Sequence, residues 1–251
     1  MSEVLRSPKD MKAFRKNLKG AVGFVPTMGA LHAGHESLIK RAAQENDHVV
    51  LSIFVNPTQF NDPKDLEKYP ATWEADLAMA QANDVRAIFY PKYDEMYPDQ
   101  YRYKLIENEF SKLLCGKDRP GHFDGVLSVV MRLFNIVSPT KAYFGEKDFQ
   151  QLSLIRGMAE AYFLDLEVVP VPTMREKDGL AMSSRNVRLT GEQREQAPWI
   201  YKALTESKSA EEASSLLTAK GFKVDYVTDL QGRRFAAAKL GEVRLIDNVQ
   251  I

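Results

Sequence analysis

The chain has 251 residues, of which 44% are hydrophobic and 27% charged, as in ordinary globular proteins. Lys plus Arg and Asp plus Glu each number 34, so the formal net charge is zero. This balance argues against the positive surface of a nucleic-acid-binding protein and favours a small-molecule substrate. The single cysteine, Cys115, cannot form an intrachain disulfide. We expect a cytoplasmic protein with no membrane partner, because neither a signal peptide nor an apolar run of about 20 residues is found.

Up to about residue 172, β-branched or aromatic runs alternate with amphipathic segments, which is typical of a parallel sheet covered by helices. The expected strands are Val22–Val25, Val49–Val55, Ala87–Tyr90, Lys141–Phe144 and Leu166–Val171. The expected helices are Gly34–Asn46, Thr72–Asn83, Gly125–Val137 and Asp148–Leu164. This order predicts an α/β fold with a doubly wound, Rossmann-like sheet, in which ligand-binding residues follow the carboxyl ends of the strands.

After Pro172 the sequence becomes polar and ends with short strand patterns near 223–228, 234–238 and 244–248. These features predict a smaller α+β domain. We place the boundary at Met174, with residues 1–174 forming the Rossmann-like, ligand-binding domain. Residues 175–251 then form a small C-terminal lid domain.

The segment PTMGALHAGH (26–35) follows the first expected strand and is the most informative part of the chain. Gly29 and Gly34 allow close approach of a ligand, and a helix that opens at Gly34 favours an anion at its N-terminus. His32 and His35 are three residues apart, which places both rings beside that N-terminus. A zinc site would need further ligands at suitable spacing, and a Walker loop would need Gly-Lys-Ser/Thr. The segment instead resembles the His-x-Gly-His signature of the nucleotidyltransferase superfamily.

Four further segments narrow this resemblance to one family. They are FVNPTQF (54–60), RPGHFDGV (119–126), FGEKDFQQL (144–152) and GLAMSSRN (179–186), and RLIDN (244–248) resembles the same family's last strand. In order and spacing the chain resembles the pantothenate synthetases. The resemblance implies ATP-dependent ligation of pantoate and β-alanine through a pantoyl adenylate, with release of AMP and pyrophosphate. It also implies Mg²⁺ and a homodimer.

The resemblance assigns catalytic roles to His35, Lys147 and Arg185. The ATP-binding residues that it implies are Met28, Gly29, Ala30, Leu31, His32, Ala33, Gly34, His35, Gly145, Glu146, Lys147, Asp148, Met174, Met182, Ser183, Ser184 and Arg185. Gln59 and Gln151 are assigned to pantoate and β-alanine, and neutral amides suit a carboxylate that must stay nucleophilic.

Two of these groups have ordinary structural alternatives. Lys147 and Asp148 are expected to meet phosphate and ribose oxygens, but a plain salt bridge between them is the alternative. Ser183, Ser184 and Arg185 suit the β- and γ-phosphates on a mobile loop, 175–186, that covers ATP. The alternative for Ser184 is a helix cap. In RPGHFDGV we expect Arg119 and His122 to be structural.

The chain departs from the family in YPATWEADL, where Ala71 and Ala75 replace a cation and a carboxylate. Asp76 remains and is the predicted metal ligand, with stabilisation of a helix N-terminus as the alternative. The C-terminal part also looks short for the family.

Two other functions compete with the ligase, namely another nucleotidyltransferase with a phosphorylated substrate and a non-catalytic binding protein. The neutral Gln59 and Gln151 argue against the first, and the intact histidine loop argues against the second.

Overall fold

The protein is described by a computed structural model of residues 2–251, and its chain divides into two compact units. The first unit contains the chain up to Gly145 together with Gln150–Val171. The second contains Glu146–Phe149 and Pro172–Ile251. The division therefore differs from the predicted boundary at Met174 by a few residues, and it also moves a four-residue segment into the C-terminal unit.

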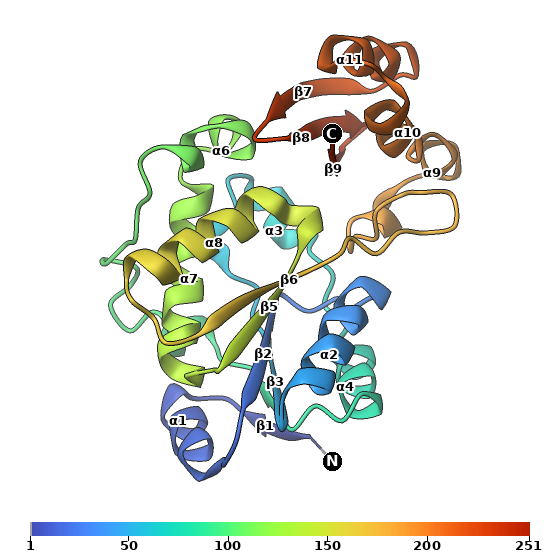
Figure 1. Ribbon diagram of the computed structural model, residues 1–251. Helices are drawn as coiled ribbons and strands as arrows, with labels where there is room; N and C mark the ends of the chain where they lie inside the picture. Colours follow the sequence, from blue (N-terminus) through green and yellow to red (C-terminus); the bar gives the residue numbers. More distant parts are fainter. Residues whose placement is uncertain (1) are drawn as a thin grey trace. The chain divides into compact units, whose positions relative to one another are not determined.

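The first unit is built on a six-stranded parallel sheet with the order β1-β4-β3-β2-β5-β6 (Figure 1). The strands are β1 (Glu3–Leu5), β2 (Val22–Thr27), β3 (His48–Ile53), β4 (Ala87–Phe89), β5 (Lys141–Gly145) and β6 (Glu167–Val171). The order reverses between β2 and β5, so the loops after these two strands lie at the topological switch point. The predicted doubly wound fold is confirmed.

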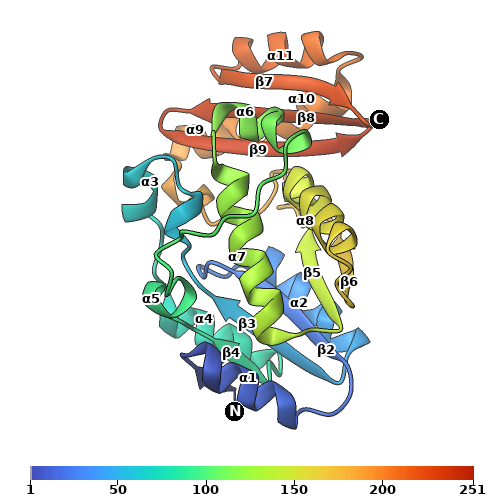
Figure 2. The ribbon, with the colours of Figure 1, turned by 90° about the vertical axis from the view of Figure 1, so that its left-hand side faces the viewer.

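Helices cover both faces of this sheet, with α2 and α7 on opposite sides (Figures 1 and 2). The α-helices are α1 (Pro8–Asn17), α2 (Ala33–Glu45), α3 (Pro63–Glu67), α4 (Trp73–Ala82), α5 (Tyr93–Met96), α6 (Leu114–Asp118), α7 (His122–Val137) and α8 (Phe149–Ala161). The 3₁₀ turns are η1 (Pro57–Gln59), η2 (Phe110–Lys112) and η3 (Glu146–Asp148). Val25, Ile39, Leu51 and Ile88 are fully buried between sheet and helices. Among residues 2–251 no helix has the length and apolarity that crossing a bilayer requires.

The expected strands and helices of the first unit all form, with ends that shift by up to three residues. Two elements at the N-terminus were not predicted. Helix α1 begins at Pro8 and is capped by Ser7, whose hydroxyl accepts a hydrogen bond from the Asp10 N–H. Strand β1 has only three residues and pairs with β4 at the sheet edge, so it carries little periodicity of its own.

The second unit has the antiparallel sheet β7-β8-β9, formed by Lys223–Leu230, Arg233–Leu240 and Val243–Gln250. Its helices are α9 (Gly191–Gln196), α10 (Trp199–Glu206) and α11 (Ala210–Ala219), preceded by the turn η4 (Asn186–Arg188). Ile200, Leu204 and Leu217 from the helices pack with Ala236 and Ala238 of β8. Small residues on β8 let the helices approach the sheet closely, which gives the predicted α+β unit its own core.

The close approach of α7 to the turn η1 supplies a test of packing. A Cβ atom on Gly125 would lie 2.5 Å from the Thr58 carbonyl oxygen and 2.8 Å from the Gln59 nitrogen, whereas one on Gly157 in α8 meets nothing within 4 Å. Gly125→Ala is therefore expected to lower the midpoint of thermal unfolding through overpacking. The control Gly157→Ala should raise stability by about 0.5–1 kcal/mol, because alanine favours a helix over glycine. If both substitutions stabilise the protein, the backbone of η1 moves without strain to accommodate the added methyl group.

Candidate active site

The loop after β2 folds around a buried carboxylate from α4. Gly29 and Ala30 have φ values of 82° and 50°, in the left-handed region. This conformation turns consecutive N–H groups in one direction. The Ala30 N–H donates to Asp76 Oδ2 at 2.9 Å, and the Leu31 N–H donates to Oδ1 at 2.8 Å. Asp76 is 2% exposed and also accepts a hydrogen bond from Thr72 Oγ1 at 3.1 Å, so it fixes the shape of the loop.

The two histidines of the loop cap helix α2. His32 is the N-cap residue, and its Nδ1 accepts a hydrogen bond from the Gly34 N–H at 3.1 Å. His35 Nδ1 accepts in return from the His32 N–H at 3.3 Å, which completes a capping box made of imidazoles. A neutral imidazole that accepts at Nδ1 carries its proton on Nε2, so the hydrogen-bond network assigns the Nε2–H tautomer to both rings. The ring centroids lie 4.1 Å apart. Both rings are thus oriented as Nε2 donors at a helix N-terminus, where an anion is favoured.

The loop after β3 brings Gln59 next to the histidine loop. Gln59 Nε2 lies 3.5 Å from the Met28 sulfur, and its Oε1 accepts from Asn56 Nδ2 at 2.9 Å. Asn56 is 1% exposed, and its Oδ1 accepts from the Tyr97 hydroxyl at 2.9 Å. Burial raises the pKa of Tyr97 to about 12, which keeps this hydroxyl protonated as a donor. Asn56 was not predicted; its position before a proline at a strand end was the available signal.

Arg119 and His122 support Gln59 from its backbone side. His122 Nδ1 lies 2.8 Å from the Gln59 carbonyl oxygen, and Arg119 Nη2 donates to the same oxygen at 3.2 Å. The expected structural role of these residues in RPGHFDGV agrees with these contacts.

Of the neighbouring residues Gln150 and Gln151, Gln150 is buried. Its side-chain amide forms hydrogen bonds with Cys115 N, Phe110 O and Leu113 O. Gln151, the predicted pantoate-binding residue, is only partly buried.

Lys147 and Asp148 lie in η3, within the second unit. The salt bridge that we weighed as the alternative is present, with Lys147 Nζ 3.5 Å from Asp148 Oδ2. Asp148 is about half exposed, and an ion pair of this kind adds little stability, so it does not oppose a role for Lys147 in ligand binding.

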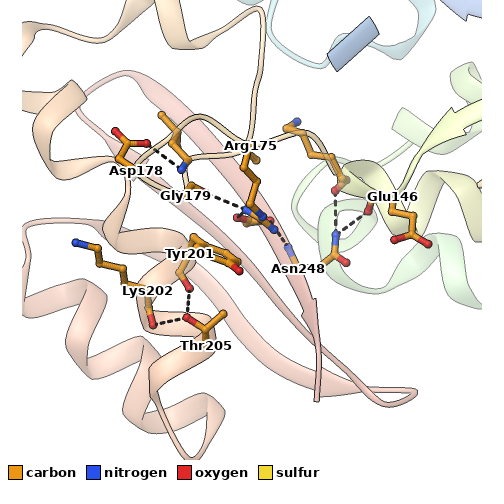
Figure 3. A network of polar contacts seen from close by, with 12 residues as sticks. Glu146, Arg175, Asp178, Gly179, Tyr201, Lys202, Thr205 and Asn248 are labelled. Atoms are coloured by element: carbon orange, nitrogen blue, oxygen red, sulfur yellow. Dashed lines mark hydrogen bonds and ion pairs between the residues drawn. The ribbon is translucent and has the colours of Figure 1, made fainter. Parts of the chain in front are cut away.

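The segment 172–186 is a hairpin-like loop with an anchored base. Met182 N–H donates to the Met174 carbonyl at 3.0 Å, and Arg175 pairs with Ala181 in a β-bridge. The Arg175 guanidinium donates to both oxygens of Asp247, at 2.6 and 2.9 Å, and lies 3.8 Å above the ring of Tyr201 (Figure 3). These contacts fix the base of the loop, and the mobility expected for residues 175–186 stays a prediction.

The serines of this loop follow the Met174–Met182 pair at the base of the hairpin. Ser183 Oγ accepts from the Arg185 N–H at 3.3 Å and forms a local turn. The alternative considered for Ser184 was a helix cap, but helix α9 is capped by Thr190, whose hydroxyl accepts from Gln193 N.

Asp76, the predicted metal ligand, has structural partners in the first unit. Both of its carboxylate oxygens accept hydrogen bonds from backbone N–H groups, and an ionised carboxylate has further lone pairs, so its metal role stays a prediction. Among residues 2–251 no group of three or more His, Cys, Asp or Glu side chains is placed to hold a metal ion. The contacts of Asp76 give it a structural role in the loop and explain why this carboxyl group can be buried.

A doubly wound parallel sheet with a histidine-capped helix at its topological switch point defines an α/β protein with the kind of anion site that nucleotide-binding enzymes use. Comparison with known proteins makes the class specific. The family model described as pantoate-beta-alanine ligase matches residues 3–250, and the chain belongs to this family.

The relatives match over nearly their whole lengths. The chain is 71% identical to the pantothenate synthetase of Bdellovibrio bacteriovorus over 251 residues, which is all of both chains. The solved pantoate-β-alanine ligase of Francisella tularensis, complexed with β-γ ATP and β-alanine, matches with a TM-score of 0.95 at 41% identity, over 100% of this chain and 98% of that one. The solved pantothenate synthetase of Thermus thermophilus gives a TM-score of 0.90 at 40% identity, over 99% of each chain. The match covers at least 98% of each of these relatives, so the C-terminal part lacks no large segment that they have.

The imidazole caps predict different outcomes for two substitutions of His35. In His35→Asn the amide can replace Nδ1 as the cap acceptor but cannot reach the position of Nε2, so stability should stay near wild type while kcat falls about 10²-fold. In His35→Gln the longer amide can supply a donor near Nε2 but loses the cap. It should retain more activity than Asn and lose about 1 kcal/mol of stability. Thermal unfolding and kcat measured on both variants test this order, and equal activities would contradict the assigned tautomer.

The contacts of Asp76 predict the behaviour of Asp76→Asn. One oxygen becomes an NH₂ group that faces a backbone N–H, so two donors oppose each other in a buried place. Stability should fall by about 1–3 kcal/mol and activity should fall with it, while the Mg²⁺ concentration for half-maximal rate stays unchanged. A Mg²⁺ titration at fixed ATP checks this. A rise in the midpoint of the Mg²⁺ titration without loss of stability would support the metal role. Ala75→Glu is the control on the exposed side of α4.

Proposed function

We propose that the chain joins pantoate to β-alanine with cleavage of ATP to AMP and pyrophosphate. Membership in the ligase family over residues 3–250 is the observation that carries the proposal. In the first step an oxygen of the pantoate carboxylate attacks the α-phosphorus of ATP, and the bond from that phosphorus to the bridging oxygen breaks to release pyrophosphate. In the second step the β-alanine amine attacks the acyl carbon, the bond to the AMP oxygen breaks, and the amine loses a proton.

Pantoate is already a carboxylate at neutral pH, so the first step needs positioning and charge stabilisation rather than a general base. His32 and His35 support this role, because their Nε2–H groups suit phosphate oxygens at the start of α2. Lys147 and Arg185 are the cations proposed to stabilise the departing pyrophosphate. Gln59, oriented by Asn56, is proposed to bind pantoate without neutralising its carboxylate.

Further predicted ATP-binding residues support the same proposal. They are the backbone of the histidine loop (Met28, Gly29, Ala30, Leu31, Ala33 and Gly34), the strand end with Gly145, Glu146 and Asp148, and the loop positions Met174, Met182, Ser183 and Ser184. Gln151 is proposed as the second amide for pantoate.

The resemblance also supports Mg²⁺, a homodimer and a cytoplasmic location. A Mg²⁺ ion that accompanies ATP is part of the substrate, and phosphate oxygens and waters are its usual ligands.

Exchange of labelled pyrophosphate into ATP tests the proposed order. We expect exchange when ATP, Mg²⁺ and pantoate are present and β-alanine is absent, because adenylation is reversible and precedes the amine. Pantolactone, in which the carboxylate is tied up as an internal ester, is the matched control and should give none. Exchange without pantoate would favour another nucleotidyltransferase, and absence of exchange under all conditions would contradict the adenylate.

A further inference from the structure

Asn248 of β9 carries a buried side-chain amide. Its two N–H donors and its carbonyl oxygen all have hydrogen-bond partners. The residue is 3% exposed. Its Nδ2 donates to the carbonyl oxygens of Glu146 at 2.9 Å and Lys147 at 3.0 Å (Figure 3). Its Oδ1 accepts from Arg233 Nε at 2.8 Å. Since the guanidinium can only donate and the two carbonyls can only accept, the orientation of the amide is fixed.

The two acceptors are consecutive carbonyls of the turn η3. Two hydrogen bonds to adjacent peptide groups fix the turn in both position and rotation, and the turn carries the Lys147 side chain. A second contact supports the end of the turn, because the Arg233 guanidinium lies 4.1 Å over the ring of Phe149. The Phe149 ring is also 6.1 Å from that of Phe235 on β8. The segment 146–149 is therefore positioned by β8 and β9, which explains its place in the second unit.

The preceding residue on β9 has a parallel task. Asp247, whose side chain is fully buried, accepts both hydrogen bonds from Arg175 at the base of the 172–186 loop. Successive residues of a strand face opposite sides of its sheet. The pair Asp247 and Asn248 thus holds two different segments that carry predicted ATP-binding residues. Both side chains belong to the motif RLIDN, which has no assigned role in the proposed reaction.

We infer that Asn248 is a positioning residue for Lys147, acting through the backbone carbonyls of Glu146 and Lys147. The inference rests on the proposed role of Lys147. It differs from a purely structural role in one respect, because loss of the Asn248 amide should matter to the rate only while the Lys147 ammonium is present.

A double-mutant cycle makes that difference measurable. Asn248→Asp keeps the shape but replaces the donor amide with a carboxylate, which repels both carbonyls; Asn248→Ala is the second variant in case the first does not fold. We expect Lys147→Met to lower kcat for pantothenate formation about 10²-fold. Asn248→Asp should lower it about tenfold, since small displacements of a catalytic group are enough for such losses. The double variant should be no slower than Lys147→Met alone.

The control is Asp229→Asn, which removes the ion pair with Arg234, 2.7 Å, elsewhere in the second unit. It should lower the thermal midpoint, with kcat per folded molecule unchanged in both the wild-type and the Lys147→Met background. If Asn248→Asp lowers kcat in the Lys147→Met background by the same factor as in the wild-type background, the inference is overturned while the role of Lys147 stands. If Lys147→Met loses less than tenfold, the role of Lys147 fails and the inference falls with it.

Discussion

The buried carboxylate of Asp76 is the interaction on which the histidine loop depends. Gly29 and Ala30 adopt left-handed conformations that point two N–H groups into the protein. Without an acceptor each buried N–H would cost about 1–3 kcal/mol, and the strained residue Ala30 would have no compensation. Asp76 satisfies both groups at once. The loop can then leave β2, turn and place His32 at the N-cap position of α2.

The same contact directs where an anion can bind. Because the Ala30 and Leu31 N–H groups are bonded to Asp76, they are not the donors that a phosphate would meet. The donors that the fold offers instead are at the start of α2, together with the Nε2–H groups of His32 and His35. The histidines therefore serve two purposes with their two nitrogens. Nδ1 stabilises the helix, and this in turn fixes the proton on the nitrogen that is proposed to face ATP.

Much of the fold and the histidine loop follow from local patterns in the sequence, whereas distant contacts do not. The central strands and α2 were predicted because buried runs alternate with amphipathic segments, and α1 was missed although Ser7 and Pro8 carried a regular start signal. The cap of α2 could not be predicted, since histidine is not among the usual capping residues. The role of Asp76 depends on backbone groups that lie 45 and 46 residues earlier, which no local pattern encodes. The hydrogen bond from Asn248 to the Lys147 carbonyl joins residues that are 101 positions apart. Its only signal in the sequence was the motif RLIDN, to which no role was assigned.

Position 75, beside Asp76, shows which of the family's two adjacent carboxylates the fold of this chain requires. The family resemblance implies a carboxylate where this chain has Ala75, and Ala75 is exposed on α4 while Asp76 is buried. Adjacent residues of a helix point about 100° apart, so only one of them can face the loop after β2. The departure therefore changes the outer surface of α4 and leaves the contacts of Ala30 and Leu31 intact. A chain that loses the exposed acid keeps its histidine loop, whereas one that lost the buried acid would leave two backbone donors without an acceptor.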